Sequence, residues 1–268
     1  MTDVIRRLAK ALTFSELGGN TPSEPLLRII PKNRPKVLIL GVYMGNRRSL
    51  INHIVPTLGS SIHCQVTQRW IAIGSVSKHA AVMAATVEAI PERTPKFTLI
   101  NSLISTVDIA KTDFIMVCDD DVTVCSDFTD RFIGWQQHCS FALAQPARTW
   151  NSYVDHSFVR RSLWCQARET RFVEIGPIFS MSRSMAELML PFDESSPMGW
   201  GYDLVWPVIA RQHGLKLGIV DAVAIEHSMR ARGALYDASN EIESMAKMLS
   251  QREHLNAREA FVVLKRFH

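Results

Sequence analysis

The chain has 268 residues, of which 47% are hydrophobic and 21% are charged, and its formal net charge is +4. This composition is that of a globular protein with a packed core, and it argues against a disordered chain. A net charge this small, without a concentrated basic face, also argues against nucleic-acid binding. The five cysteines are widely spaced and form no CxxC pair, which argues against structural zinc and a disulfide framework.

The N-terminal segment, residues 1–35, is predicted to be a helix followed by a linker. Residues 1–17 place apolar side chains at helical spacing opposite Arg6, Arg7 and Lys10. We expect this helix to pack on the domain or on a partner, with weak peripheral membrane association as the alternative. We find no signal peptide and no apolar run of membrane-spanning length. We therefore expect a cytoplasmic protein, with the inner face of the membrane as the alternative location.

The next part of the chain alternates strand and helix patterns, which predicts a parallel sheet built from βαβ units. A dinucleotide fingerprint is absent, because Gly41 and Gly45 do not form a GxGxxG pattern. The expected strands are 37–43, 68–73 and 114–118, and the expected helices are 49–58, 79–90 and 97–110.

The pattern changes after residue 126. We expect helices over 127–138 and 182–190, strands over 141–145 and 217–225, and a strand pair or bent strand over 172–181. Residues 241–267 have the pattern of an amphipathic helix. The predicted organisation is therefore a main domain over 36–236 and a helical tail over 237–268 packed on it.

Three consecutive carboxylates, Asp119, Asp120 and Asp121, end the apolar strand of residues 114–118. Ligands of parallel α/β sheets bind beyond the carboxyl ends of the strands. Because side chains alternate along an extended segment, we expect Asp119 and Asp121 on one side and Asp120 on the other. Paired carboxylates suit Mg²⁺ or Mn²⁺ with substrate phosphates. The alternative is a solvated acidic turn or a structural Ca²⁺ loop.

Two further features follow in the second half of the chain. Asp203 comes after Gly199-Trp200-Gly201, and His227 ends the strand predicted over 217–225. Taken singly, each has an ordinary structural explanation, because a lone histidine is often a packed residue and an aspartate after a loop often caps a helix.

Together and in this order, these features resemble glycosyltransferases of the GT-A fold. The segment from Val173-Glu174-Ile175-Gly176-Pro177 to His227 also resembles a poorly characterised family of plant and bacterial glycosyltransferase-like proteins. The resemblance covers roughly residues 36–236. It implies an α/β, GT-A-like fold, in which a Rossmann-like βαβ nucleotide-binding half joins a mixed acceptor-binding half in one continuous sheet.

The resemblance also implies an activity, namely metal-dependent transfer of a sugar from a nucleotide-sugar donor to a saccharide or another hydroxyl acceptor. By this resemblance Asp121, Asp119 and His227 hold Mn²⁺ or Mg²⁺, Asp119 and Asp120 contact the donor, and Asp203 is the general base of an inverting reaction. Trp200 and Glu174 would then face the acceptor. From their places in the chain, we expect Arg230 and Arg232 to close over the diphosphate and Tyr43 to contact the base or ribose.

Two alternatives remain at this point. A metal-dependent sugar nucleotidyltransferase would share the architecture and the acidic site, although its Gly-rich loop has only a poor counterpart in residues 41–47. A non-catalytic binding module of the same fold would keep the cleft and transfer nothing.

Overall fold

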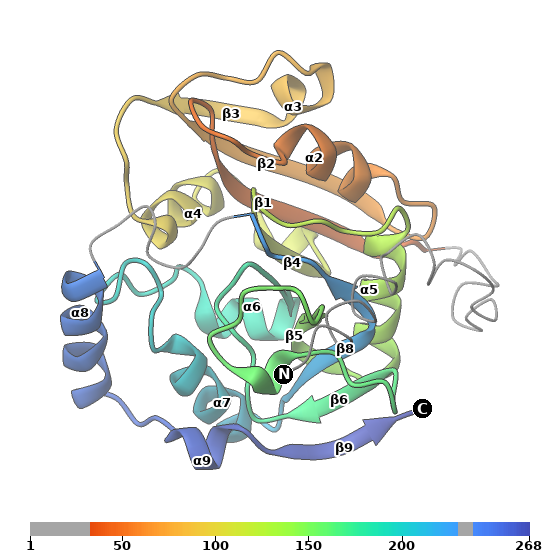
Figure 1. The fold of residues 1–268 in the computed structure, drawn as a ribbon, viewed down its shortest axis with the longest axis vertical. Coiled ribbons are helices and arrows are strands. Elements are labelled where there is room, and N and C mark those ends of the chain that lie inside the picture. Colours follow the sequence, from red (N-terminus) through yellow and green to blue (C-terminus); the bar gives the residue numbers. More distant parts are fainter. Residues whose placement is uncertain (1–32, 230–237) are drawn as a thin grey trace, which may run out of the picture.

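The computed structural model describes residues 33–229 and 238–268. The helix expected over residues 1–17, and Arg230 and Arg232, lie outside the described residues. Within them, nine strands form one mixed sheet in the order β3-β2-β1-β4-β7-β5-β8-β6-β9 (Figure 1). The expectation of one continuous α/β sheet is confirmed.

The first four strands make the parallel half of the sheet. β1 pairs in parallel with β2 and β4, and β2 pairs in parallel with β3. Most residues of β1 and β4 are buried, as expected of strands covered on both faces. The elements are β1 (Lys36–Met44), α2 (Ile51–Gly59), β2 (Gln65–Ile73), α3 (Ala80–Ala85), β3 (Thr86–Ile90), α4 (Lys96–Ile104) and β4 (Phe114–Asp119).

The second half is mixed, because β7 inserts antiparallel between β4 and β5 while β5 pairs in parallel with β8. β6 and β9 then extend the sheet antiparallel to their neighbours. The elements are α5 (Phe128–His138), β5 (Phe141–Arg148), β6 (Ala167–Thr170), β7 (Ile178–Ser182), α6 (Arg183–Met189), α7 (Tyr202–Gln212), β8 (Lys216–Ile225), α8 (Ala238–Ser250), α9 (Ala257–Ala260) and β9 (Val263–Phe267).

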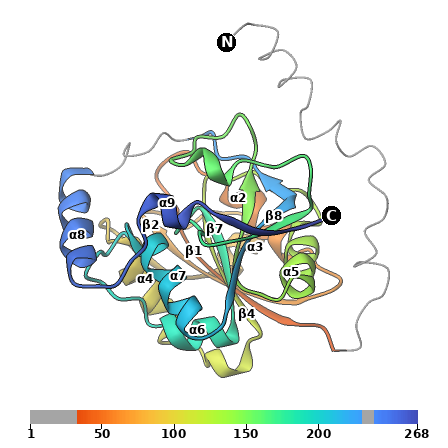
Figure 2. The same ribbon diagram turned by 90° about the horizontal axis from the view of Figure 1, so that it is seen from below.

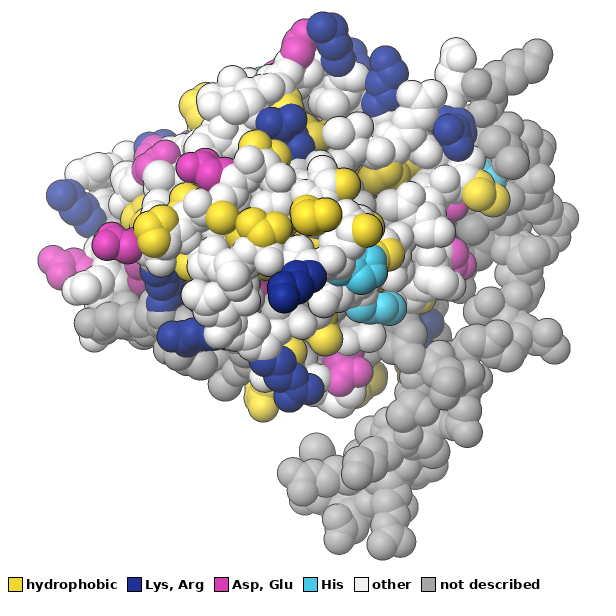
Figure 3. All heavy atoms as spheres, turned by 90° about the horizontal axis from the view of Figure 1, so that it is seen from above, with side chains coloured by type: hydrophobic (Ala, Val, Ile, Leu, Met, Phe, Trp, Pro, Cys, Tyr) yellow, Lys and Arg dark blue, Asp and Glu magenta, His cyan; other side chains and the backbone are white. Residues whose placement is uncertain are grey.

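The expected helix over residues 79–90 is half wrong, because the helix ends at Ala85 and Thr86–Ile90 is strand β3. Thr86, Val87 and Ile90 are β-branched residues that suit a strand, and β2 offers them an open edge. At this edge of the sheet Val87 of β3 is exposed, and so is Met83 of the preceding helix α3. Figure 3 looks onto this edge and shows hydrophobic side chains at the surface.

The C-terminal segment also differs from the expected helix over 241–267. The helix ends at Ser250, and Val263–Phe267 is strand β9, paired antiparallel with β6. Two further elements are shorter than expected: the helix over 97–110 stops at Ile104, and in residues 172–181 the strand begins only at Ile178. The strand expected over 217–225 is present as β8 (Lys216–Ile225), and β9 follows it in the chain.

Helices lie on both faces of the sheet (Figure 2), and apolar side chains fill the space between. On one face Ile39 packs with Ile54 and Phe128 from α2 and α5, and on the other Leu40 packs with helix residues such as Phe97 and Trp206. Among the described helices, none is both long and apolar enough to cross a bilayer. A large cavity lies at the carboxyl ends of the parallel strands.

Candidate active site

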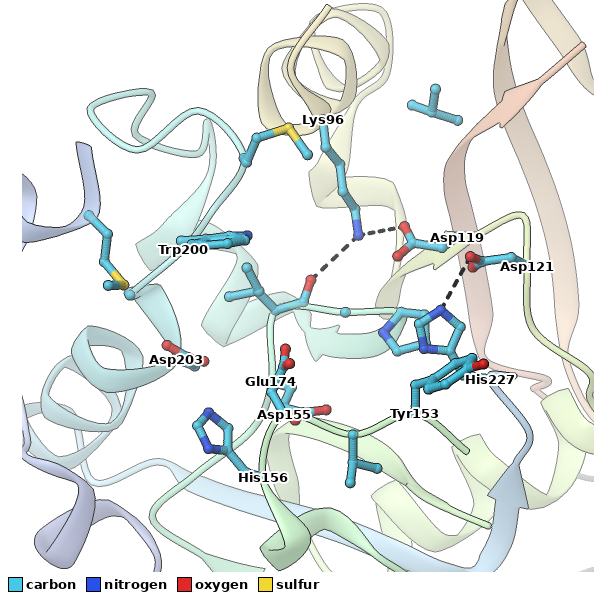
Figure 4. A pocket seen from close by; sticks show the side chains of 18 of the residues that line it. Lys96, Asp119, Asp121, Tyr153, Asp155, His156, Glu174, Trp200, Asp203 and His227 are labelled. Carbon is cyan, nitrogen blue, oxygen red and sulfur yellow. Dashed lines mark hydrogen bonds and ion pairs between the residues drawn. The ribbon is translucent and has the colours of Figure 1, made fainter. Parts of the chain in front are cut away.

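A cavity of about 650 Å³ lies beyond the carboxyl ends of β1 and β4. Its lining includes Asp119, Asp120, Asp121, Glu174, Trp200, Asp203 and His227. Figure 4 shows two groups of side chains, with Asp119, Asp121 and His227 at one end and Trp200, Asp203 and Glu174 toward the other. Segments more than a hundred residues apart in sequence therefore contribute to a single cavity.

The three aspartates after β4 have different surroundings. Asp119 forms an ion pair with Lys96, whose Nζ lies 2.6 Å from Oδ1. Asp120 is buried, and its Oδ2 accepts a hydrogen bond of 2.9 Å from the backbone N–H of Met44 at the end of β1. Asp121 faces His227. We infer that the Asp120 carboxylate helps to join β1 to β4, although the residue also lines the cavity.

Asp121 and His227 are brought together by backbone pairing just beyond their strands. Thr123 and Glu226 form an isolated antiparallel bridge, which ties the segment after β4 to the end of β8. His227 is held further by the hydrogen bond from its N–H to Ser152 Oγ, at 3.0 Å. As a result, His227 Nε2 lies 3.2 Å from Asp121 Oδ2 (Figure 4).

The two ring nitrogens of His227 have different neighbours. Nδ1 lies 3.2 Å from Arg148 Nη1, and Nε2 faces Asp121. The tautomer decides which nitrogen carries the proton, and Nε2 can ligate an ion only in the tautomer that leaves it unprotonated. Neutral imidazole and carboxylate are both ligands of Mn²⁺-type ions. Within the described residues, no three histidine, cysteine, aspartate or glutamate side chains are arranged so that they could hold a metal ion by themselves. A divalent ion held by Asp121 and His227 would therefore need water and substrate phosphate to complete its coordination.

Arg148 is a buried cation between the two ends of the cavity. It is 4% exposed, and its Nη2 lies 2.7 Å from Glu174 Oε2. Burial lowers the pKa of Arg148, against the opposing effect of Glu174. Burial raises the pKa of Glu174 to about 6, although Arg148 acts to lower it. The pair holds Glu174 in place at the cavity wall.

Asp203 lies in the first turn of α7, just after the two glycines. Gly199 and Gly201 adopt φ values of +89° and +88°, a region that glycine enters without strain. This path places Trp200 and Asp203 on the cavity wall, where Figure 4 shows both. Burial, followed by repulsion from Glu174, raises the pKa of Asp203 to about 7. A carboxylate of this pKa can accept a proton near neutral pH.

Asp155 and His156 complete the end of the cavity that holds Asp203 (Figure 4). The His156 ring packs against Phe261, with centroids 4.8 Å apart, and Phe261 belongs to the C-terminal segment. Met245 of α8 also lines the cavity. The segment expected to be a tail packed on the domain therefore forms part of this wall.

Tyr43 does not line the cavity, in contrast to the expectation of a base or ribose contact. It is 1% exposed, and its hydroxyl lies 3.0 Å from Thr86 Oγ1. The reason is strand alternation, because Val42 and Met44 line the cavity and Tyr43 points to the opposite face of the sheet.

Several cavity residues were missed by reasoning from the sequence. Lys96 and Arg148 are the main ones, and His156 also belongs to this group. Arg148 ends a fully buried strand, and a charged residue in that place was the available signal. For Lys96, at the start of a helix, the sequence contains no comparable signal.

No protein-family model and no curated protein sequence matches the chain. Solved structures do match. The crystal structure of GalNAc-T7 with UDP, GalNAc and Mn²⁺ superposes with a TM-score of 0.53 at 11% identity, over 75% of this chain and 44% of that one.

Two further structures cover more of the chain. The mannosyltransferase PcManGT from Pyrobaculum calidifontis, in complex with GDP-Man and Mn²⁺, gives a TM-score of 0.56 at 16% identity, over 94% of this chain and 72% of that one. A mycobacterial protein gives 0.53 at 14% identity, over 89% and 82%. At such low identities the likeness establishes the fold, which is the GT-A fold. The chain spans less than half the length of GalNAc-T7.

Proposed function

We propose that the protein is a metal-dependent glycosyltransferase that moves a sugar from a nucleoside-diphosphate sugar to a hydroxyl acceptor. The observation that carries the proposal is the single cavity with two chemically different ends. One end holds Asp121 beside His227 at 3.2 Å, and the other holds Asp203 with a pKa of about 7. The Mn²⁺-containing complexes of the two named structural neighbours are consistent with it.

Asp121 and His227 would hold a divalent ion, which supplies Lewis-acid stabilisation of the charge on the departing diphosphate. Lys96, paired with Asp119 at 2.6 Å, is a cation on the same wall. The Asp119 carboxylate is already paired with Lys96. We therefore assign Asp119 to the donor contact rather than to direct ligation of the ion. Arg148, fixed by Glu174, keeps His227 oriented.

Asp203 takes the proton from the acceptor hydroxyl in the proposed reaction. The acceptor oxygen forms a bond to the anomeric carbon, and the bond from that carbon to the phosphate oxygen breaks. Its electron pair leaves with the diphosphate, and the proton remains on Asp203. Direct displacement inverts the anomeric configuration. Trp200 gives the acceptor sugar an apolar face to stack on.

The test is incubation with a panel of nucleotide-sugars, Mn²⁺ and candidate acceptors, with detection of the free nucleoside diphosphate and the glycosylated product. We expect Mn²⁺-dependent transfer. Release of pyrophosphate from a sugar 1-phosphate and a nucleoside triphosphate would instead identify a nucleotidyltransferase. Nucleotide binding without any turnover would identify a binding module.

Calorimetry with a nucleoside diphosphate tests the metal end separately. Asp121→Asn should abolish most of the Mn²⁺-dependent part of the affinity, because one of the two protein ligands loses its charge. Asp127→Asn is the matched control, since Asp127 is an exposed aspartate outside the cavity lining. Equal Mn²⁺ dependence in the two variants would refute the metal assignment.

A further inference from the structure

The segment between β5 and β6, residues 149–166, combines unusual exposure with tight anchoring; we call it the β5–β6 loop. Two adjacent residues, Leu163 and Trp164, are 70% and 82% exposed. Trp150 and Tyr153 of the same loop are 62% and 52% exposed. Large apolar side chains gathered at one surface commonly mark an interaction site.

The loop holds these side chains on one connected stretch of backbone. Arg148 and Arg160 form a parallel bridge, so the chain leading to Trp150 runs beside the chain leading to Ser162 and Leu163. The Arg160 guanidinium lies over the Trp150 ring, 5.6 Å from its centroid, and also donates to the Trp150 carbonyl at 2.6 Å. Arg160 therefore holds Trp150 against the strand of the loop that continues to Leu163 and Trp164.

A buried ion pair fixes the base of the loop. Arg168 and Asp221 lie 2.8 Å apart, and both are buried between β6 and β8. Arg168 also donates to the carbonyls of Phe158 and Arg160, and Asp221 accepts from the Ser162 N–H at 2.7 Å. The pair lies outside the candidate site, and it orients the loop with Leu163 and Trp164 outward.

The charge of the loop favours an anionic partner. Arg160 and Arg161 are partly exposed, whereas the sole acidic residue of residues 149–166 is Asp155, which lines the cavity. Tryptophan and tyrosine prefer the interface between water and lipid, and arginine is attracted to acidic headgroups. An aliphatic leucine next to the exposed tryptophan suits a bilayer better than a saccharide, which stacks on aromatic rings.

We propose that the β5–β6 loop docks the protein on a membrane surface that carries acidic headgroups, with Leu163 and Trp164 inserted at the interface. Tyr153 both belongs to this loop and lines the cavity, so docking would bring the cavity mouth close to the bilayer (Figure 4). The inference goes beyond the proposed function and does not rest on it, because lipid binding is measured without donor or acceptor.

The test is co-sedimentation with vesicles of phosphatidylcholine alone and of phosphatidylcholine mixed with phosphatidylglycerol. We expect the full chain to partition onto the mixed vesicles at low salt, less so at high salt, and weakly onto neutral vesicles. Leu163→Ser/Trp164→Ser should lower the partition coefficient at least about tenfold, since it removes the apolar insertion. Arg161→Gln should reduce binding to the mixed vesicles alone.

The matched control is Met83→Ser/Val87→Ser, which changes one exposed apolar side chain of α3 and one of β3 on the face seen in Figure 3. This control should bind vesicles like the parent, and all variants should keep the parent's circular dichroism spectrum. Any of the following results overturns the proposal: no vesicle binding by the parent, unchanged binding of the Leu163/Trp164 variant, or equal loss in the control. Self-association or saccharide binding that depends on Trp164, in place of lipid binding, also overturns it.

Discussion

At the scale of single residues, the most informative group is the Asp203 carboxylate, which lies beside Glu174 at the buried end of the cavity. In its proposed role as general base it must be deprotonated, so kcat/KM should rise with pH through about 7. Asp203→Asn should lower transfer by about 10²–10⁴-fold and leave donor binding nearly unchanged. Asp155→Asn, the same isosteric change in the same cavity, should have a much smaller effect. Near-normal turnover of Asp203→Asn, or a product with retained configuration, would disprove the assignment.

The same carboxylate links folding stability to pH. In the folded chain its pKa is raised from 3.8 to about 7, so the folded state holds this proton after the unfolded chain has lost it. Between these values the folded state binds more protons, and this group's contribution to the free energy of unfolding falls as pH rises. Asp203→Asn should therefore melt at a higher temperature than the parent at pH 8, with the difference disappearing near pH 4. A variant less stable than the parent at pH 8 would contradict this linkage.

At the scale of elements, the packing of α8 on the start of α7 depends on Gly201. A Cβ added at Gly201 would lie 2.8 Å from Met245 Cγ and 3.0 Å from Met248 Cε, in addition to the strain of φ +88°. Gly201→Ala should destabilise the fold by about 2–4 kcal/mol, from backbone strain and overpacking together. Gly214→Ala is the control, because Gly214 has φ +65° and open space around it. Gly214→Ala should lower the free energy of unfolding by about 1–2 kcal/mol. Urea denaturation measures both variants, and equal midpoints for the two would show that α8 does not pack tightly against Gly201.

At the scale of the whole molecule, the C-terminal strand β9 is the edge strand on one side of the sheet. β9 pairs with β6, and Phe267 packs edge-on against Phe141 of β5, with centroids 5.7 Å apart. Phe267→Ala should lower the free energy of unfolding by about 1–3 kcal/mol, less than the loss for a fully buried ring. Leu264→Ala on the same strand, where Leu264 is 49% exposed, should be nearly neutral. Urea denaturation measures both, and equal effects would mean that β9 is not integrated into the core.

The predictions from sequence succeeded where neighbouring residues along the chain are enough to specify the structure. The apolar run of β4 into Asp119–Asp121 indicated a buried strand, whose carboxyl end lines the cavity, and the strand–helix alternation indicated the parallel half. The patterns failed where a neighbour decided the structure. Thr86–Ile90 is compatible with helix or strand, and the open edge of β2 made it a strand. Val263–Phe267 became a strand because β6 offers its edge, a contact between residues about a hundred positions apart.

The sequence by itself determined which residue types are available: carboxylates at a strand end, glycines around Trp200, and a histidine after β8. Only the tertiary structure decided their partners. The Thr123–Glu226 bridge set His227 against Asp121, and strand alternation removed Tyr43 from the cavity. Lys96 and Arg148 became cavity residues through α4 and β5. The physical reason is that ion pairing and burial act over a few ångströms in space, and separation along the chain does not encode that distance.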